Sequence, residues 1–317
     1  MSVRLLTRVL LLAQAAAALA AGWALWRWGG APAWLAAAGG LLAVALVRLL
    51  INMNNFVLAA RFASATPDEF RLGMGARLRL LAAEFRASML ATSWLMPCGA
   101  ARTTVYPGST QAPVLLLHGY GCNSGYWAHL IPLLDAARIS HASVDLEPIA
   151  GDIDGYVSQV EQAVTALCTA AKATQVAIVA HSMGGLVARA WLRVHGGARL
   201  AHLVTLGTPH HGTALARFGP GRNAVQMRRS AGAPDGNEPE GAGPWLRALA
   251  ASESPDLRAR ITSLYTHHDN IVSPQTSSLL PGARNIAFGG VGHVALGSDP
   301  RVLAEVMRLL AALEVNA

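Results

Sequence analysis

Apolar positions follow two different patterns, before and after about residue 110. In the first part, two long apolar runs span residues 9–26 and 33–47, and Gln14 is the one polar side chain within them. In the second part, short apolar runs of strand length alternate with stretches of helical periodicity. The first pattern is typical of helices in a membrane, and the second of a mostly parallel sheet with crossover helices.

The two long runs predict a helical hairpin over residues 1–52. The first run approaches the ~20 residues that a bilayer core requires, and the second does so if Arg48 extends its charge to the interface and residues 49–51 join the helix. Between them lies the turn-like segment Gly29-Gly30-Ala31-Pro32. A cleaved signal peptide is the alternative, since Arg4 and Arg8 precede the first run. A second apolar run is unnecessary for export, so we expect a retained membrane anchor.

Positive charge predicts the orientation of this hairpin. Arginines flank the hairpin on both outer sides, and its turn carries only Arg27. The flanking residues are Arg4 and Arg8 before it, and Arg48, Arg61, Arg71, Arg77 and Arg79 after it. Because positive flanks stay in the cytoplasm, we expect an anchor in a bacterial inner membrane with the following domain facing the cytosol. An exported or periplasmic protein is the alternative.

Residues 53–110 are expected to form a helical linker. Thr66 and Pro67 suit a helix start, and apolar residues recur at near-helical spacing as far as residue 95. We expect this helix over residues 66–95 to pack on the following domain. A helix on the membrane surface is the alternative, since four arginines lie along it.

Residues 111–317 predict one α/β domain. The expected strands are residues 113–117, 141–146, 175–179, 201–206, 261–265 and 284–288. The expected helices are residues 127–137, 156–171, 184–194 and 300–313. A Gly- and Pro-rich stretch at about 218–244 is too long for an ordinary connection and predicts a short lid-like loop, with a plain surface loop as the alternative.

The expected strand 175–179 and helix 184–194 meet in Ala180-His181-Ser182-Met183-Gly184, where an apolar strand runs through small residues into a helix. A serine in such a turn, which is called a nucleophile elbow, stands out at the end of the strand. Small residues two positions away let strand and helix approach closely. Ser182 is therefore the candidate nucleophile. The amides at the start of the helix favour a nearby oxyanion.

This segment resembles the α/β-hydrolase superfamily, and especially its bacterial lipases and esterases. The common motif has glycine where Ala180 stands. The segment Leu117-His118-Gly119-Tyr120-Gly121 resembles the oxyanion loop of these enzymes, and Val204 to Thr213 resembles the strand and turn that follow the elbow helix. The resemblance extends from about residue 112 to the C-terminus. It implies an α/β-hydrolase fold, with backbone N–H groups of Tyr120 and Met183 as oxyanion donors.

A serine needs a base, and the base needs an acid to orient it. In this fold the chain order is serine, acid, histidine. Asp269 follows the expected strand 261–265, and His293 lies in a glycine-rich loop after the strand 284–288. We expect Ser182, Asp269 and His293 to form a triad, with His181 bracing the elbow.

The expected activity is hydrolysis of acyl esters, including lipid-like esters, through an acyl-enzyme. The same triad would serve a thioesterase, an amidase or an acyltransferase, and a non-catalytic membrane scaffold is a further alternative. We expect no cofactor and no metal, because His210 and His211 lack carboxylate or cysteine ligands at suitable spacing. Cys122 is not expected to be a nucleophile, because it lacks a strand-to-helix turn and a base of its own. The net charge of +7 comes from scattered arginines, so a membrane is a better partner than nucleic acid. Oligomeric state is left open.

Overall fold

One mostly parallel sheet forms the centre of the second part of the chain. The computed structural model describes residues 2–230 and 241–313. Among these residues seven strands pair in the order β1-β3-β2-β4-β5-β6-β7. Their bounds are β1 Thr103–Thr104, β2 Val114–Leu117, β3 His141–Val144, β4 Val176–His181, β5 Leu200–Leu206, β6 Ile261–Thr266 and β7 Arg284–Phe288. The short β1 is antiparallel to β3, and each of the other pairs is parallel. The expected parallel sheet is confirmed.

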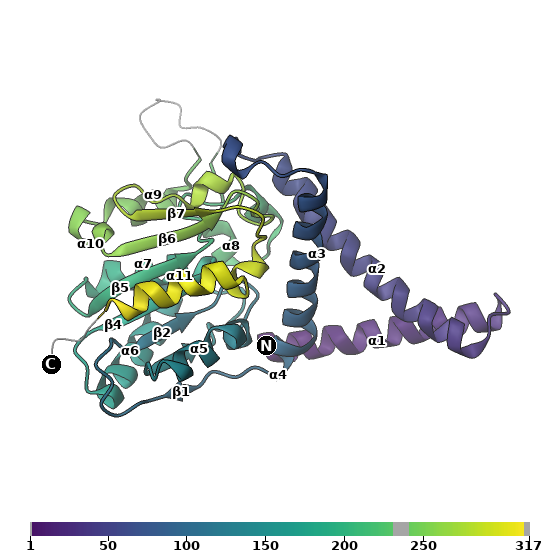
Figure 1. Cartoon of the computed structure of the whole chain (residues 1–317), viewed down its shortest axis with the longest axis horizontal. Coiled ribbons are helices and arrows are strands. Elements are labelled where there is room, and N and C mark those ends of the chain that lie inside the picture. Colours follow the sequence, from purple (N-terminus) through teal and green to yellow (C-terminus); the bar gives the residue numbers. More distant parts are fainter. Residues whose placement is uncertain (1, 231–240, 314–317) are drawn as a thin grey trace.

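Helices cover both faces of this sheet (Figure 1). In β2, Leu115 and Leu117 pack into one apolar core with α6 (Val157–Ala171) and α7 (Met183–His195). Val114 and Leu116 pack into the other with α5 (Ile131–Ala136) and α11 (Pro300–Ala311). Successive strand residues point to opposite faces, so strands buried on both sides need continuous apolar runs. The remaining helices of this part are α8 (Arg222–Gln226), α9 (Pro244–Ala251) and α10 (Pro255–Ala259).

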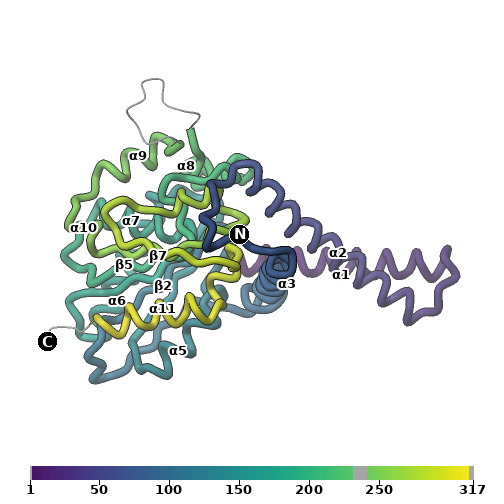
Figure 2. Tube along the Cα trace, turned by 45° about the horizontal axis from the view of Figure 1, so that its top comes forward, coloured from purple at the N-terminus to yellow at the C-terminus, as the bar shows by residue number. Residues whose placement is uncertain are grey.

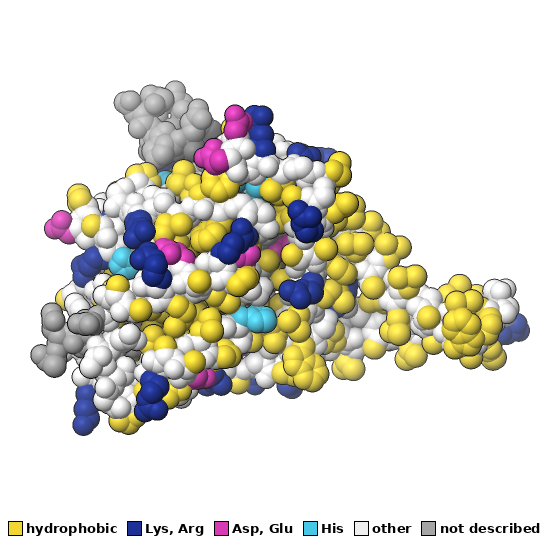
Figure 3. All heavy atoms as spheres, in the orientation of Figure 1, with side chains coloured by type: hydrophobic (Ala, Val, Ile, Leu, Met, Phe, Trp, Pro, Cys, Tyr) yellow, Lys and Arg dark blue, Asp and Glu magenta, His cyan; other side chains and the backbone are white. Residues whose placement is uncertain are grey.

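Two long helices, α1 (Val3–Arg27) and α2 (Ala33–Ala60), project from this domain as a hairpin (Figures 1 and 2). They approach closely where the residues are small, since a Cβ on Gly40 would lie 2.1 Å from the Ala18 carbonyl oxygen. Hydrophobic side chains cover much of the projecting part (Figure 3). Both helices are long and apolar enough to cross a membrane, by length and composition alone. The expected pair of apolar helices is present, and α2 runs nine residues beyond Ile51, through several asparagines.

The helix expected over residues 66–95 begins later than predicted. Asp68–Phe70 forms one 3₁₀ turn, and α3 (Met74–Leu90) starts after the extended residue Gly73. The Phe70 ring packs on His267, with ring centroids 4.6 Å apart, so a tertiary contact overrides the capping pattern at Thr66. After Leu90 the chain continues as a π turn at Ala91–Leu95 and as α4 (Met96–Cys98).

Two further expectations are affected by local structure. The helix expected from residue 127 begins at Ile131, because a 3₁₀ segment, Ser124–His129, precedes it and Pro132 occupies the first turn of α5. The lid-like loop expected at about 218–244 lies partly outside the described residues, at 231–240. Its described part includes α8 and a bridge between Thr213 and Arg228.

Candidate active site

Ser182 lies in the sharp turn between β4 and α7. Its backbone has φ 54° and ψ −125°, a conformation that costs energy for any residue with a Cβ. Its amide donates to the Leu206 carbonyl at 2.8 Å, and its carbonyl accepts from the Thr208 hydroxyl at 2.9 Å. A Cβ on Gly184 would lie 2.4 Å from the Leu117 carbonyl oxygen, so the close approach of α7 to β2 requires glycine there. The strained turn is therefore held from several sides.

Asp269 and His293 form a buried pair on the loops that follow β6 and β7. His293 Nδ1 lies 2.8 Å from Asp269 Oδ2. The other carboxylate oxygen accepts the amides of Ile271 and Val272 at 2.8 and 2.7 Å, so the carboxylate is fixed in one orientation. The His293 amide donates to Asn270 Oδ1 at 3.0 Å.

The electrostatics of this pair favour a basic imidazole. Burial lowers the pKa of His293, but the charge and hydrogen bond of Asp269 and the charge of Glu84 raise it more, and the net direction is upward from 6.5. A carboxylate that holds Nδ1–H leaves Nε2 as the free acceptor of the neutral ring.

The nucleophile turn and this pair lie against the same residue, Gly207. A Cβ on Gly207 would lie 3.2 Å from Asp269 Oδ2 and 3.3 Å from His293 Nδ1, while the preceding Leu206 accepts the Ser182 amide. The described side chains include no hydrogen bond between Ser182 Oγ and His293 Nε2. In free enzymes such contacts are often long and tighten only with substrate.

The expected oxyanion loop is also next to Ser182. A Cβ on Gly119 would lie 2.8 Å from Ser182 Cβ, so the loop could not approach with a larger residue. His118 braces the loop, since its Nδ1 lies 2.9 Å from the Gly119 carbonyl and its Nε2 accepts the Leu146 amide at 2.9 Å. The Tyr120 hydroxyl donates to the Pro220 carbonyl at 2.7 Å. Tyr120 follows Gly119 in this loop, and Met183 follows Ser182 at the start of α7, so both belong to turns next to the candidate nucleophile.

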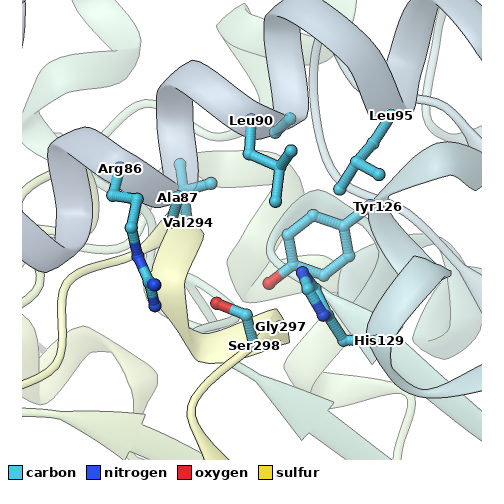
Figure 4. A pocket seen from close by; sticks show the side chains of 10 residues that line it. Arg86, Ala87, Leu90, Leu95, Tyr126, His129, Val294, Gly297 and Ser298 are labelled. Atoms are coloured by element: carbon cyan, nitrogen blue, oxygen red, sulfur yellow. The ribbon is translucent and has the colours of Figure 1, made fainter.

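His181 braces the elbow, as expected from its place in the sequence. Its Nε2 lies 3.2 Å from the His293 carbonyl oxygen, and its ring stacks on Tyr126 with centroids 4.0 Å apart. Burial lowers the pKa of His181 well below its ordinary value, so the ring is neutral. Behind Tyr126 lies a crevice of about 300 Å³, into which Leu90 and Leu95 point from the opposite wall (Figure 4).

The sequence analysis missed Glu84, which lies on α3 and is completely buried. Its two carboxylate oxygens accept the amides of Val294 and Ala295, both at 2.9 Å, directly after His293. Burial raises the pKa of Glu84, and the two amides and the charge of His293 oppose that rise. The sequence offered one indication of its importance: Glu84 is the one acidic residue in a helix whose other charged residues are arginines, and it lies on the packed side. Its partners lie 210 residues away and could not be read locally.

The first hundred residues contact three of the loops near Ser182: the segment after the expected oxyanion loop, the acid loop and, through Glu84, the base loop. Asn123 Nδ2 donates to the Met96 carbonyl at 2.8 Å, and Ser273 Oγ donates to the Ala59 carbonyl at 2.7 Å. Val3, at the start of α1, is buried in a small cluster with Met96 and Cys122. Ser182 itself is only 7% exposed. The helix that was expected to pack on the catalytic part does so, together with both ends of the hairpin.

Other candidates for chemistry have partners or unfavourable surroundings. Burial raises the pKa of the Cys122 thiol to about 12, which disfavours a thiolate nucleophile. Both ring nitrogens of His210 lie 3.2 Å from protein groups, Arg189 Nη1 and Thr205 Oγ1. The surroundings of Cys122 and His210 therefore favour structural roles over catalysis.

Comparisons with known proteins point to one kind of fold. Residues 113–233 match the family model described as palmitoyl protein thioesterase. The mature lipase of Bacillus licheniformis superposes with a TM-score of 0.55 at 17% identity, covering 67% of this chain and 97% of the lipase. Lipase B of Aspergillus fumigatus superposes with a TM-score of 0.56 at 17% identity, covering 69% of this chain and 57% of that protein. A comparison with curated proteins gives no match.

Proposed function

We propose that this chain, which has the α/β-hydrolase fold, is a membrane-anchored serine hydrolase of acyl esters. One observation carries the proposal: the buried Asp269–His293 pair, at 2.8 Å, lies on loops that meet the strained turn of Ser182. An orienting carboxylate, a base and a serine in a sharp strand-to-helix turn are the parts that acyl transfer requires.

The roles follow from the positions. Ser182 Oγ attacks the ester carbonyl carbon while its proton passes to His293 Nε2, and Asp269 stabilises the resulting imidazolium. The amides of Tyr120 and Met183 donate to the oxyanion of the tetrahedral intermediate. The proton on His293 then goes to the leaving alcohol, which leaves an acyl-enzyme. Water, deprotonated by the same ring, releases the acid and restores Ser182.

Thioesters are the second candidate substrate class. The match of residues 113–233 to a palmitoyl protein thioesterase model supports it. The matched segment includes Ser182 and the oxyanion loop, and it ends before Asp269. The same triad cleaves both bonds, so the leaving group and acyl chain decide between them.

Membrane anchoring is part of the proposal. The length and composition of α1 and α2 support it, and exposed tryptophans at the far end of the hairpin suit the membrane interface. These are Trp23, Trp26, Trp28 and Trp34. The excess of arginine outside the hairpin favours a catalytic part in the cytosol. Alkaline phosphatase fused at Gly30 should be active and fused after Arg61 inactive; the reverse result would contradict this orientation.

Matched substrates test the activity. Full-length protein in detergent would be given an ester, a thioester and an amide with the same acyl group, as wild type and as Ser182→Ala. We expect the ester or thioester to be turned over and the substitution to lower kcat by at least about 10⁴-fold. Ser158→Ala is the matched control, because Ser158 is exposed on α6. Turnover that survives Ser182→Ala would reject this nucleophile.

A further inference from the structure

The hairpin and α3 enclose a cavity on the outer side of the catalytic part. It has a volume of about 380 Å³ and lies between α1, α2 and α3, the three helices that form a triangle in Figure 1. Its polar lining includes Gln14, Arg48, Asn52 and Thr92. It reaches Gly121, the residue after Tyr120 in the oxyanion loop. The cavity therefore extends from the hairpin to the end of the expected oxyanion loop.

Arg48 is a cation in this cavity without an anionic partner. Its guanidinium donates to Ser93 Oγ at 2.8 Å, to Gln14 Oε1 at 3.4 Å and to Thr92 Oγ1. These acceptors are neutral, and no carboxylate among residues 2–230 and 241–313 pairs with Arg48. A charge in a membrane-facing helix is costly unless it is neutralised, and such a residue points to a functional partner. The missing partner is an anion.

Asn52 gives a second and independent indication of a ligand. It lies one helical turn after Arg48 and is 6% exposed, yet its Oδ1 has no hydrogen-bond partner. Residues four apart on a helix share a face, so the two side chains line the same cavity. A buried polar atom without a partner is costly unless a ligand or water satisfies it. Asn52 Oδ1 is an acceptor, so the ligand that satisfies it carries a hydrogen-bond donor, such as a hydroxyl, beside the anionic group that pairs with Arg48.

The surroundings of these polar groups are apolar. Leu10, Ile51 and Phe85 line the same cavity. A second cavity, of about 530 Å³, lies further along α2 and α3 between Phe56 and Leu81 and reaches His268, the neighbour of Asp269. Space of this kind suits acyl chains. A molecule with an anionic head and an acyl chain therefore matches these two cavities along α2 and α3.

We propose that this cavity binds an anionic membrane lipid, whose carboxylate or phosphate pairs with Arg48 and whose head donates a hydrogen bond, from a hydroxyl group, to Asn52 Oδ1. The inference rests on the proposed hydrolase function and names its substrate class: an acyl ester with an anionic head, taken up laterally from the membrane between α2 and α3. The head binds beside the oxyanion loop, while the acyl chain lies along the apolar side chains of the two cavities.

Binding without turnover tests this site. Full-length Ser182→Ala protein in phosphatidylcholine nanodiscs would be titrated with oleate, with oleoyl lysophosphatidate and with neutral monooleoylglycerol, and binding read by native mass spectrometry. The two anions separate a carboxylate head from a phosphate head, and inorganic phosphate tests the head without a chain. Arg48→Gln removes the cation. Asn52→Asp, of the same shape, places an internal carboxylate beside Arg48. Arg27→Gln is the matched control, since Arg27 is exposed at the hairpin turn.

We expect at least one lipid anion to bind more tightly than monooleoylglycerol and inorganic phosphate. Arg48→Gln and Asn52→Asp should each weaken that binding by about tenfold or more, because a charge-assisted hydrogen bond is lost or already occupied. Arg27→Gln should leave it unchanged. Equal affinity for the neutral lipid, or affinity retained in either cavity variant, would overturn the proposal. A protein that hydrolyses no ester would refute the proposed function and leave this binding result to stand on its own.

Discussion

At the scale of single residues, the most informative contact is made by Glu84. Its carboxylate holds the two amides that follow His293, while Asn270 holds the amide of His293 itself. Because each Glu84 oxygen accepts one N–H, the ionised form fits this site. The ring of His293 is thus positioned by Asp269 at one end and by Glu84 through the backbone at the other.

Glu84→Gln should impair catalysis through His293. An amide can accept only one of the two N–H groups, so we expect kcat to fall by about tenfold or more and the free energy of unfolding to fall by about 2 kcal/mol. The base must be neutral, so kcat/KM of the wild type should rise with pH through a pKa above 6.5. Since the charge of Glu84 helps to raise that pKa, the acid limb should move to lower pH in the variant.

The pH profile separates positioning from simple support of the fold. Glu305→Gln is the control, because Glu305 lies on α11 and pairs with Arg308. A Glu84→Gln protein with the kcat and the acid limb of the wild type would show that Glu84 does not act on His293. Rates would be measured from pH 5 to 9 on one soluble ester.

At the scale of elements, the strand-to-helix turn at Ser182 depends on the absence of side chains nearby. A Cβ on Gly184 would lie 2.4 Å from the Leu117 carbonyl and 2.7 Å from that of His118. Both contacts are with backbone, which cannot move aside without shifting β2 and the oxyanion loop. The separation of α7 from β2 is therefore set by this glycine.

Gly184→Ala should destabilise the protein and reduce its activity. Overpacking at such a contact costs about 1–3 kcal/mol, and the displaced loop carries Tyr120, so both the unfolding free energy and kcat should fall. Gly75→Ala is the control, because a Cβ there meets only Arg79 Nη1, at 3.8 Å. Denaturant unfolding and ester turnover measure the two effects. Equal values for the two variants would contradict this account of the turn.

The difference between local patterns and long-range contacts explains what the sequence could predict. The elbow, the oxyanion loop and the acid and base loops follow strands directly, so local patterns locate Ser182, Tyr120, Asp269 and His293. The start of α3 depends on the packing of Phe70 on His267, and the role of Glu84 depends on residues far along the chain. The extension of α2 to Ala60 was missed because Asn52, Asn54 and Asn55 resemble a helix end. Local chemistry was readable, and long-range contacts were not.

At the scale of the whole molecule, the first hundred residues contact the loops of the proposed active site. The end of α2 forms a hydrogen bond with the loop after β6, from Ser273 to the Ala59 carbonyl. Helix α3 accepts a hydrogen bond from the loop after β7 through Glu84. The start of α1 contributes Val3 to a cluster beside Cys122. The hairpin extends outward from this interface in both views (Figures 1 and 2). The hairpin and the proposed active site therefore form one unit.

Two truncations should separate these contributions. A protein starting at Met53 keeps Ala59 and Glu84, and it should turn over a short soluble ester with a kcat within about threefold of the full-length value. A protein starting at Arg102 loses Glu84 and should fall by at least about tenfold, since the charged hydrogen bonds to the base loop are absent. Near-UV circular dichroism would check that each is folded. Equal activity of the two folded proteins would contradict a catalytic contribution from α3.

The central claim, that Ser182 is an activated nucleophile, is tested most directly by covalent labelling. Full-length protein in detergent would be treated with a fluorophosphonate, and the modified residue located by peptide mass spectrometry. The account predicts one adduct, on Ser182, which disappears in Ser182→Ala, forms much more slowly in His293→Ala and is retained in Ser158→Ala. An adduct elsewhere, or none on folded protein that binds substrate, would contradict it.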